Sequence, residues 1–296
     1  MTEINIVNTL RLLSIEMVQN ANSGHPGMPL GCAPMIYILL FKLMNHNPKN
    51  ENWINRDRFI LSNGHGCALL YSSLYLSGYN ITKEDLKNFR KVGSITPGHP
   101  EKGITPGVEV TTGPLGQGIA NGVGMALASK KLSTKFNTSD IKLIDHNIYV
   151  MCGDGCLMEG ISYEAASLAG HLKLDNLIVL YDDNKITIDG STDLTFTENI
   201  DMRFKSLGWD VFEVKDGNLD LKSIEETIKK AQKSEKPSII KVETKIGFLS
   251  KKEGSESSHG SPLGEEEVIR LRKLFNFNDF NKFEFPDDIL KIKDLM

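Results

Sequence analysis

Two oxygen-bearing side chains, Asp154 and Asn184, directly follow two apolar runs of the sequence. Asp154 lies between two glycines after the run 147–152, and Asn184 ends an Asp-Asp-Asn turn after the run 176–181. A helical pattern separates the runs, so they are expected to be buried parallel strands whose carboxyl ends meet at one sheet edge. A few protein oxygens together with phosphate oxygens are the usual ligands of magnesium. The spacing therefore predicts a magnesium ion that bridges a diphosphate.

Other interpretations of these turns are weaker. A lone Gly-Asp-Gly turn is more often a strand-to-helix connection without a ligand, but the second polar turn at the same edge favours a site. A dinucleotide site would need G-x-G-x-x-G opening a helix after the first strand, and a Walker site would need its lysine motif. Neither pattern is present.

The elements that must position these residues alternate between strands and helices. This alternation predicts an α/β fold of three layers, α/β/α, around a mostly parallel sheet. The stretch 248–260 is polar and contains glycine, which predicts a mobile loop. We expect strands at 58–61, 147–152, 176–181, 209–214 and 238–242, and helices at 5–19, 34–44, 67–76 and 162–171, with another opened by a capping box at Thr82 and Asp85.

Four of the seven histidines adjoin glycine or proline in predicted turns, namely His25, His65, His99 and His259. Imidazoles that donate, accept and exchange protons near neutral pH suit a polyhydroxylated sugar. No histidine pair has the spacing of a zinc site. His46, His146 and His171 lie in polar surroundings without a turn signature and are interpreted as structural.

Small residues recur every four positions at Gly118, Gly122 and Ala126. On a helix they form one flat face that permits close approach of another element. The pattern leaves two partners open, a second domain or the chain's own core.

Composition narrows the class of protein. The 296 residues carry a formal net charge of -4, which gives no general attraction to nucleic acid or to an anionic membrane. No apolar stretch reaches about 18 residues, and the first residues lack the pattern of a signal peptide, so a cytoplasmic protein is expected. The four cysteines form no C-x-x-C pair and are interpreted as reduced, buried thiols.

Several longer motifs resemble the transketolase family. The string from Asp182 to Gly190, DDNKITIDG, is similar to the family, although its turn reads Asp-Asn where the wider thiamine diphosphate signature reads Asn-Asn. The strings SGHPGMP from Ser23, LSNGH from Leu61, PGHP from Pro97 and TTGPLGQG from Thr111 occur in the family's order. The resemblance implies the thiamine diphosphate-binding fold, with thiamine diphosphate and Mg²⁺ as cofactors.

The same resemblance implies roles for individual residues. Asp154, the Asn184 side chain and the backbone carbonyl of Ile186 would bind the metal. His25, His259 and His99 would be catalytic and would contact the substrate, with His259 also at the cofactor. The other implied cofactor contacts are His65, Gly113, Pro114, Leu115, Gly155, Glu159, Ile188 and Ile246. Glu159 and Glu164 also resemble family carboxylates near a dimer contact.

The family's activity is transfer of a two-carbon ketol unit from a ketose phosphate to an aldose phosphate. The resemblance implies sugar phosphate substrates, a homodimer, and a pyrimidine-binding domain that supplies the cofactor-activating glutamate. We expect 1–274 to be the diphosphate domain and 275–296 a linker toward that second domain, so the isolated chain would be inactive. The alternatives are one subunit of a two-chain enzyme, a truncated non-catalytic or regulatory relative that binds the cofactor, and another class of thiamine diphosphate enzyme, which the TTGPLGQ string disfavours.

Overall fold

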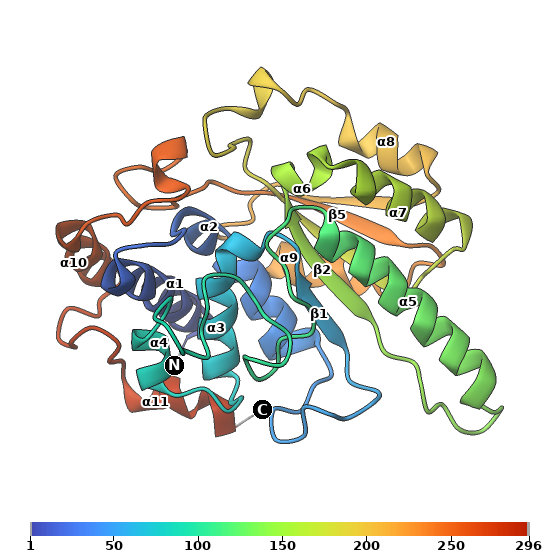
Figure 1. Cartoon of the computed structure of the whole chain (residues 1–296), viewed down its shortest axis with the longest axis horizontal. Coiled ribbons are helices and arrows are strands. Elements are labelled where there is room, and N and C mark those ends of the chain that lie inside the picture. The colour runs from blue at the N-terminus through green and yellow to red at the C-terminus, as the bar shows by residue number, and fades with distance from the viewer. Residues whose placement is uncertain (1, 295–296) are drawn as a thin grey trace.

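The computed structural model describes residues 2–294, and these contain one parallel sheet of five strands (Figure 1). The spatial order is β1-β2-β3-β5-β4, and every neighbouring pair is parallel. The expected α/β class and parallel sheet are therefore confirmed, and strand positions agree within two residues at each end. The strands are β1 (Arg58–Leu61), β2 (Ile148–Gly153), β3 (Leu177–Asp183), β4 (Asp210–Val214) and β5 (Ser238–Glu243).

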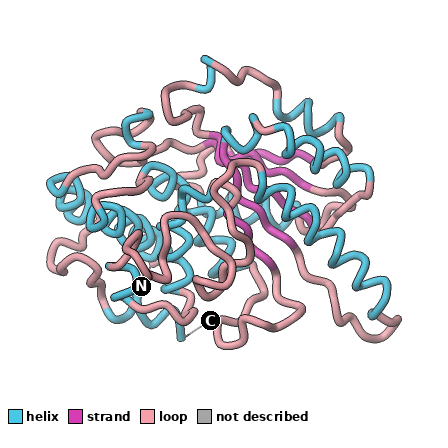
Figure 2. The backbone as a smooth tube through the Cα atoms, in the orientation of Figure 1, coloured by secondary structure: helices cyan, strands magenta, loops and turns pink. Residues whose placement is uncertain are grey.

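Helices cover both faces of the sheet, as Figures 1 and 2 show. In β2, Ile148, Val150 and Cys152 belong to one core cluster, while Tyr149 and Met151 belong to the other. Strands buried on both faces need apolar side chains on both, which explains the continuous runs in the sequence. One layer comprises α1 (Glu3–Ala21), α2 (Gly27–Ile38), α3 (Cys67–Leu76), α9 (Leu221–Ala231) and α10 (Glu265–Leu274), and the other comprises α5 (Gln117–Phe136), α7 (Gly160–His171) and α8 (Ile200–Ser206).

Two helix predictions have different outcomes. The short helix α4 (Lys83–Lys87) has the predicted capping box, because Thr82 and Asp85 each bond the other's backbone N–H. The helix predicted at 34–44 begins seven residues earlier, at Gly27, and continues beyond Ile38 as a π-helical turn, Leu39–Leu43. Every residue of α2 is buried, so packing outweighs the low helix propensity of its prolines.

The small-residue face of α5 packs against the chain's own core. A Cβ atom added at Gly118 would lie 2.5 Å from Ser62 Cα, and one added at Gly122 would lie 2.5 Å from Val150 Cγ2. Of the two open partners, internal packing is the one that the structure shows for these glycines. This contact places α5 directly over β2.

The described part of the segment after α10, 275–294, folds back onto the helical layer, and its expected role as a linker toward a second domain stays a prediction. Glu16 of α1 has no exposed surface and accepts hydrogen bonds from Arg272 and from the backbone N–H of Phe283. The segment gives no sequence signal because its apolar residues follow no helical or strand period. Six of its side chains enter the core, those of Phe275, Phe277, Phe283, Phe285, Ile289 and Ile292.

The four cysteines are buried free thiols, as predicted. Within residues 2–294, no helix combines the length and the apolar character needed to cross a membrane.

Candidate active site

A cavity of about 380 Å³ opens at the carboxyl ends of β2 and β3. The register pairs Gly153 with Asp182, so the Gly-Asp-Gly turn and the Asp-Asp-Asn turn leave the sheet side by side. Ligands bind at this edge in open parallel sheets. The lining includes the predicted residues His25, His65, Gly113, Leu115, Asp154, Gly155, Glu159, Asn184, Ile186, Ile188, Ile246 and His259.

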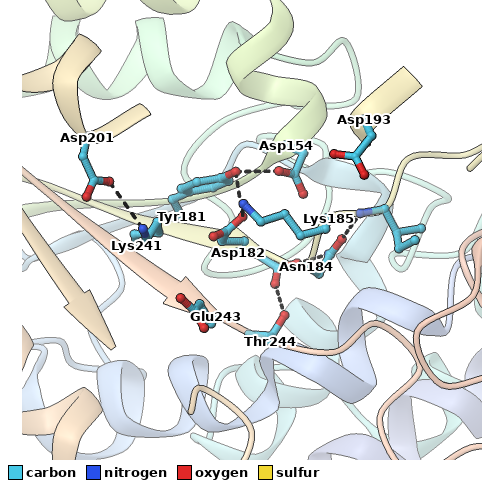
Figure 3. Close-up of polar contacts among 12 residues, drawn as sticks. Asp154, Tyr181, Asp182, Asn184, Lys185, Asp193, Asp201, Lys241, Glu243 and Thr244 are labelled. Carbon is cyan, nitrogen blue, oxygen red and sulfur yellow. Dashed lines mark hydrogen bonds and ion pairs between the residues drawn. The ribbon is translucent and has the colours of Figure 1, made fainter. Parts of the chain in front are cut away.

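Asp154 lies at the carboxyl end of β2 and lines the cavity there (Figure 3). Its side chain is buried, and the Tyr181 hydroxyl donates a hydrogen bond to Oδ1. Its other oxygen, Oδ2, is buried without a partner among the described residues. Burial, with a smaller contribution from the nearby carboxylates of Asp182 and Asp183, raises the pKa of Asp154 to about 7 against the lowering effect of the Tyr181 hydrogen bond. A buried carboxylate in this state is stabilised by a cation.

Asn184 is held at the same edge by an internal turn. Its Nδ2 donates to Asp182 Oδ2 at 2.8 Å, and its Oδ1 accepts from the Ile186 backbone N–H at 3.0 Å. Asp182 also accepts a hydrogen bond from Thr244, and its burial raises its pKa. Asn184 is therefore oriented by Asp182, and Figure 3 shows both beside Asp154.

The donors at this end suit a hard divalent cation. They are a carboxylate, an amide oxygen and backbone carbonyls, which is the oxygen set that Mg²⁺ prefers. The third carboxylate, Asp183, is paired with Lys185 at 2.7 Å. Residues 2–294 hold no group of three His, Cys, Asp or Glu residues arranged for a metal.

Three of the four predicted histidines meet in the lining of the same cavity. The ring centroids of His25, His65 and His259 lie 4.9–5.5 Å apart. Burial lowers the pKa of all three, with the neighbouring imidazoles adding to the effect for His25, whose pKa falls to about 4, and for His65. The rings are therefore neutral at pH 7, and His25 Nδ1 is buried without a partner in the described chain.

His99 is placed differently. It is absent from the cavity lining and borders a second cavity of about 500 Å³ together with Ser23, Arg90 and Gly98. Gly113 stands between the two cavities with φ +154°, and a Cβ atom there would lie 3.3 Å from the His99 ring. The backbone of Gly113 can approach a ligand because it has no side chain.

The remaining wall is apolar on one side and acidic at the rim. A Cβ atom on Gly155 would lie 2.8 Å from Leu115 Cδ1, so the two residues are in close contact. Glu159 is an exposed lining residue. Pro114 and Glu164 are exposed and do not line the cavity.

The loop that carries His259 is tied to the body of the domain. Gly247 N–H donates to the Gly27 carbonyl at 2.9 Å, and Lys251 N–H donates to Glu267 of α10 at 2.8 Å. These bonds hold the beginning of the loop, at Gly247, and its middle, at Lys251. The mobility expected for this loop stays a prediction.

Comparison with known proteins agrees with this geometry. The family model described as transketolase, thiamine diphosphate binding domain, matches residues 2–294. The chain belongs to the transketolase family. A transketolase of Halalkalibacterium halodurans is 54% identical over 284 residues, and the chloroplastic transketolase-1 of Arabidopsis thaliana is 55% identical over 286 residues. Each alignment covers 96% of this chain, but 42% and 38% of the relative.

Solved transketolase structures share the fold. The enzyme from Leishmania mexicana superposes with a TM-score of 0.98 at 48% identity, covering 100% of this chain and 44% of that one. A Pichia stipitis transketolase in complex with sedoheptulose-7-phosphate has a TM-score of 0.96 at 50% identity, covering 99% and 44%. The chain thus spans about two fifths of the length of these transketolases, and the predicted family and thiamine diphosphate-binding fold are confirmed.

Some lining residues of this transketolase domain had no predicted role in the site. Asn63 is 1% exposed, lines the cavity, and has no partner for either side-chain polar atom among the described residues. It follows β1 at the same edge as Asp154, so the strand-end argument could have found it. Asp182 and Met28 also line the cavity and were not assigned to it.

Proposed function

We propose that the cavity binds thiamine diphosphate through Mg²⁺. The observation that carries the proposal is the buried, unpartnered Oδ2 of Asp154, beside two further carboxylates, at the edge where parallel sheets bind ligands. Asp154, the Asn184 side chain and the Ile186 carbonyl would hold the metal. Their oxygen chemistry fits Mg²⁺, and diphosphate oxygens would complete its ligands.

The rest of the cavity would hold the organic part of the cofactor. Gly155 and His65 would lie against the diphosphate, since a glycine backbone allows close approach and a neutral imidazole donates a hydrogen bond. The cavity's lining is mainly apolar away from the acids, which suits an aromatic ring. Contacts to the ring region would come from Gly113, Leu115, Ile188 and Ile246, with Glu159 at the rim. Pro114 would support this region from outside the cavity, through its neighbours Gly113 and Leu115.

We propose that the assembled enzyme transfers a two-carbon ketol unit between sugar phosphates. Bound thiamine diphosphate supplies the carbon chemistry needed to break and form a bond next to a carbonyl. His25 and His259, both with lowered pKa values, would accept and return protons of the sugar hydroxyls. His99, at the wall of the adjoining cavity, would contact the hydroxyl end of the donor sugar.

The activity would require more than this chain. The relatives that match it are more than twice its length, and we propose that a pyrimidine-binding domain or subunit completes the site in a homodimer. Glu159 and Glu164 are exposed and available for such a contact. A cytoplasmic location is also a proposal, which fractionation of the source cells would test.

Calorimetric titration of the chain tests the cofactor proposal. Thiamine diphosphate is expected to bind with 1–5 mM Mg²⁺, and to bind at least tenfold more weakly in EDTA or in Asp154→Ala. Metal-independent binding would contradict the roles of Asp154 and Asn184. Ketol transfer from a ketose phosphate to an aldose phosphate is then measured with and without the second domain added. Equal rates in the two samples would contradict the proposed need for that domain.

A further inference from the structure

One side chain, Arg90, contacts both of the turns that carry His25 and His99. Its Nη1 donates to Ser23 Oγ at 2.8 Å, two residues before His25. Its Nη2 donates to the Gly98 carbonyl at 3.3 Å, one residue before His99. These turns lie more than 70 residues apart in the sequence, so the guanidinium is a direct bridge between them.

The fit around the bridge is close on each side. A Cβ atom at Gly98 would lie 3.2 Å from Arg90 Nε, and one at Gly24 would lie 3.1 Å from the ring of Phe89. Arg90 itself has φ +62°, a left-handed conformation that is uncommon for a residue with a side chain. Its backbone N–H donates to the Thr96 carbonyl at 3.0 Å, which holds that conformation. The backbone thus accepts strain at the position from which the side chain reaches both turns.

The charge on this bridge has no acidic partner in the described part of the chain. No ion pair forms to Arg90, and its Nε is buried without a hydrogen-bond acceptor. The guanidinium field therefore acts on the nearby imidazoles. It adds to burial in lowering the pKa of His99, and it acts with burial, His259 and His99 in lowering the pKa of His25.

We propose that Arg90 is a positioning residue of this active site, which fixes the His25 and His99 turns relative to each other. The inference rests on the proposed function, because it concerns the histidines assigned to the sugar substrate. Arg90 touches neither the cofactor cavity nor a reacting atom. It acts through the two turns, and a ring displacement of about 1 Å at a reaction centre can cost about 100-fold in rate.

The decisive measurement is the pH titration of ¹³C-labelled histidine rings by NMR in the 296-residue chain. Resonances are assigned with His25→Gln and His99→Gln. In Arg90→Met, the pKa of His25 is expected to rise above about 4, and the pKa of His99 is expected to rise too. Arg90→Lys keeps the charge but loses the two-armed contact, so it should preserve the pKa values while shifting the resonances of both rings.

Lys91→Met is the matched control. Lys91 borders the same second cavity, but among the described residues its Nζ donates a hydrogen bond only to Asn88. This variant should leave both histidines as in the wild type, and His46 and His146 report on folding in every variant. The proposal would be overturned if His25 and His99 had the wild-type pKa values in folded Arg90→Met. It would also be overturned if Lys91→Met changed these pKa values as much as Arg90→Met does. If Arg90→Met does not fold, unshifted ring resonances in Arg90→Lys would overturn it.

A second readout separates this inference from the proposed function. Arg90→Met should bind thiamine diphosphate and Mg²⁺ within about twofold of the wild type, while kcat/KM of the assembled enzyme falls about 100-fold. Failure of the wild type to bind the cofactor would refute the proposed function and leave the histidine titrations intact. Unchanged kcat/KM in Arg90→Met would refute the positioning role alone.

Discussion

Replacing Asp154 with asparagine should make the ligand-free protein more stable while abolishing its metal site. The geometry permits the exchange, because an asparagine oxygen can still accept the Tyr181 hydrogen bond made to Oδ1. The amide nitrogen would take the place of Oδ2, which has no partner among the described residues. What is removed is a buried negative charge next to two further carboxylates.

The magnitude follows from the pKa of Asp154, raised from 3.8 to about 7. A difference of about 3 units at 1.36 kcal/mol each gives about 4 kcal/mol. Because the folded-state pKa is raised above the unfolded value, the neutral acid's advantage is complete below pH 4 and is lost as the pH rises to 7. Asp154→Asn avoids this loss, so its stability gain should be near zero at pH 4 and reach about 2–4 kcal/mol at pH 8.

Urea unfolding in EDTA at pH 4, 6 and 8 measures this gain. Calorimetry at pH 8 then compares thiamine diphosphate binding with Mg²⁺ in the two proteins. A variant less stable than wild type at pH 8, or a gain that does not grow with pH, would refute the electrostatic reasoning. Retained Mg²⁺-dependent affinity in Asp154→Asn would refute the assignment of the metal ligand.

Three further changes test other parts of the fold. Arg272→Met should lower the free energy of unfolding in urea by about 3–5 kcal/mol, because it leaves the fully buried carboxyl of Glu16 without its ion-pair partner; an effect below 1 kcal/mol would contradict this. Burial raises the pKa of Asp57 to about 6. The free energy of unfolding of the wild type, relative to that of Asp57→Asn, should therefore fall by up to about 3 kcal/mol between pH 4 and 7. Urea titrations at several pH values would measure this fall. Gly122→Ala should cost about 1–3 kcal/mol in thermal or urea unfolding, whereas Gly124→Ala, where a Cβ atom meets nothing within 4 Å, should stabilise α5 by up to about 1 kcal/mol; similar losses for both would contradict the packing argument.

The convergence of the Asp154 and Asn184 turns was predictable because it depends on sheet geometry. Two apolar runs separated by a helix are parallel neighbours, so their carboxyl ends must meet, whatever the loops do. The pairing of Gly153 with Asp182 confirms that these two strand ends meet. Hydrogen bonds between residues close together in the sequence were equally predictable, as in the Thr82 and Asp85 capping box.

The features that could not be predicted depend on contacts between residues whose spacing in the sequence follows no helical or strand period. The glycine- and proline-flanked turns marked four histidines, but nothing in the turns separates His99 from the other three rings. His99 lies against Gly113, and only the fold brings these two residues together. The segment 275–294 likewise packs through irregularly spaced phenylalanines and the buried Glu16, and only a three-dimensional core brings these together.

The cavity combines two buried carboxylates, Asp154 and Asp182, with imidazoles whose protonation is opposed by burial and by the neighbouring rings. Neither set of groups attracts an anion by itself. A diphosphate can approach Asp154 only with a cation that both groups share, and a sugar can approach His25 without displacing a counter-ion. On the proposed function, these charges would separate the two tasks: the carboxylates would select a metal-bound anion, and the neutral imidazoles would be free to exchange protons with a hydroxylated substrate.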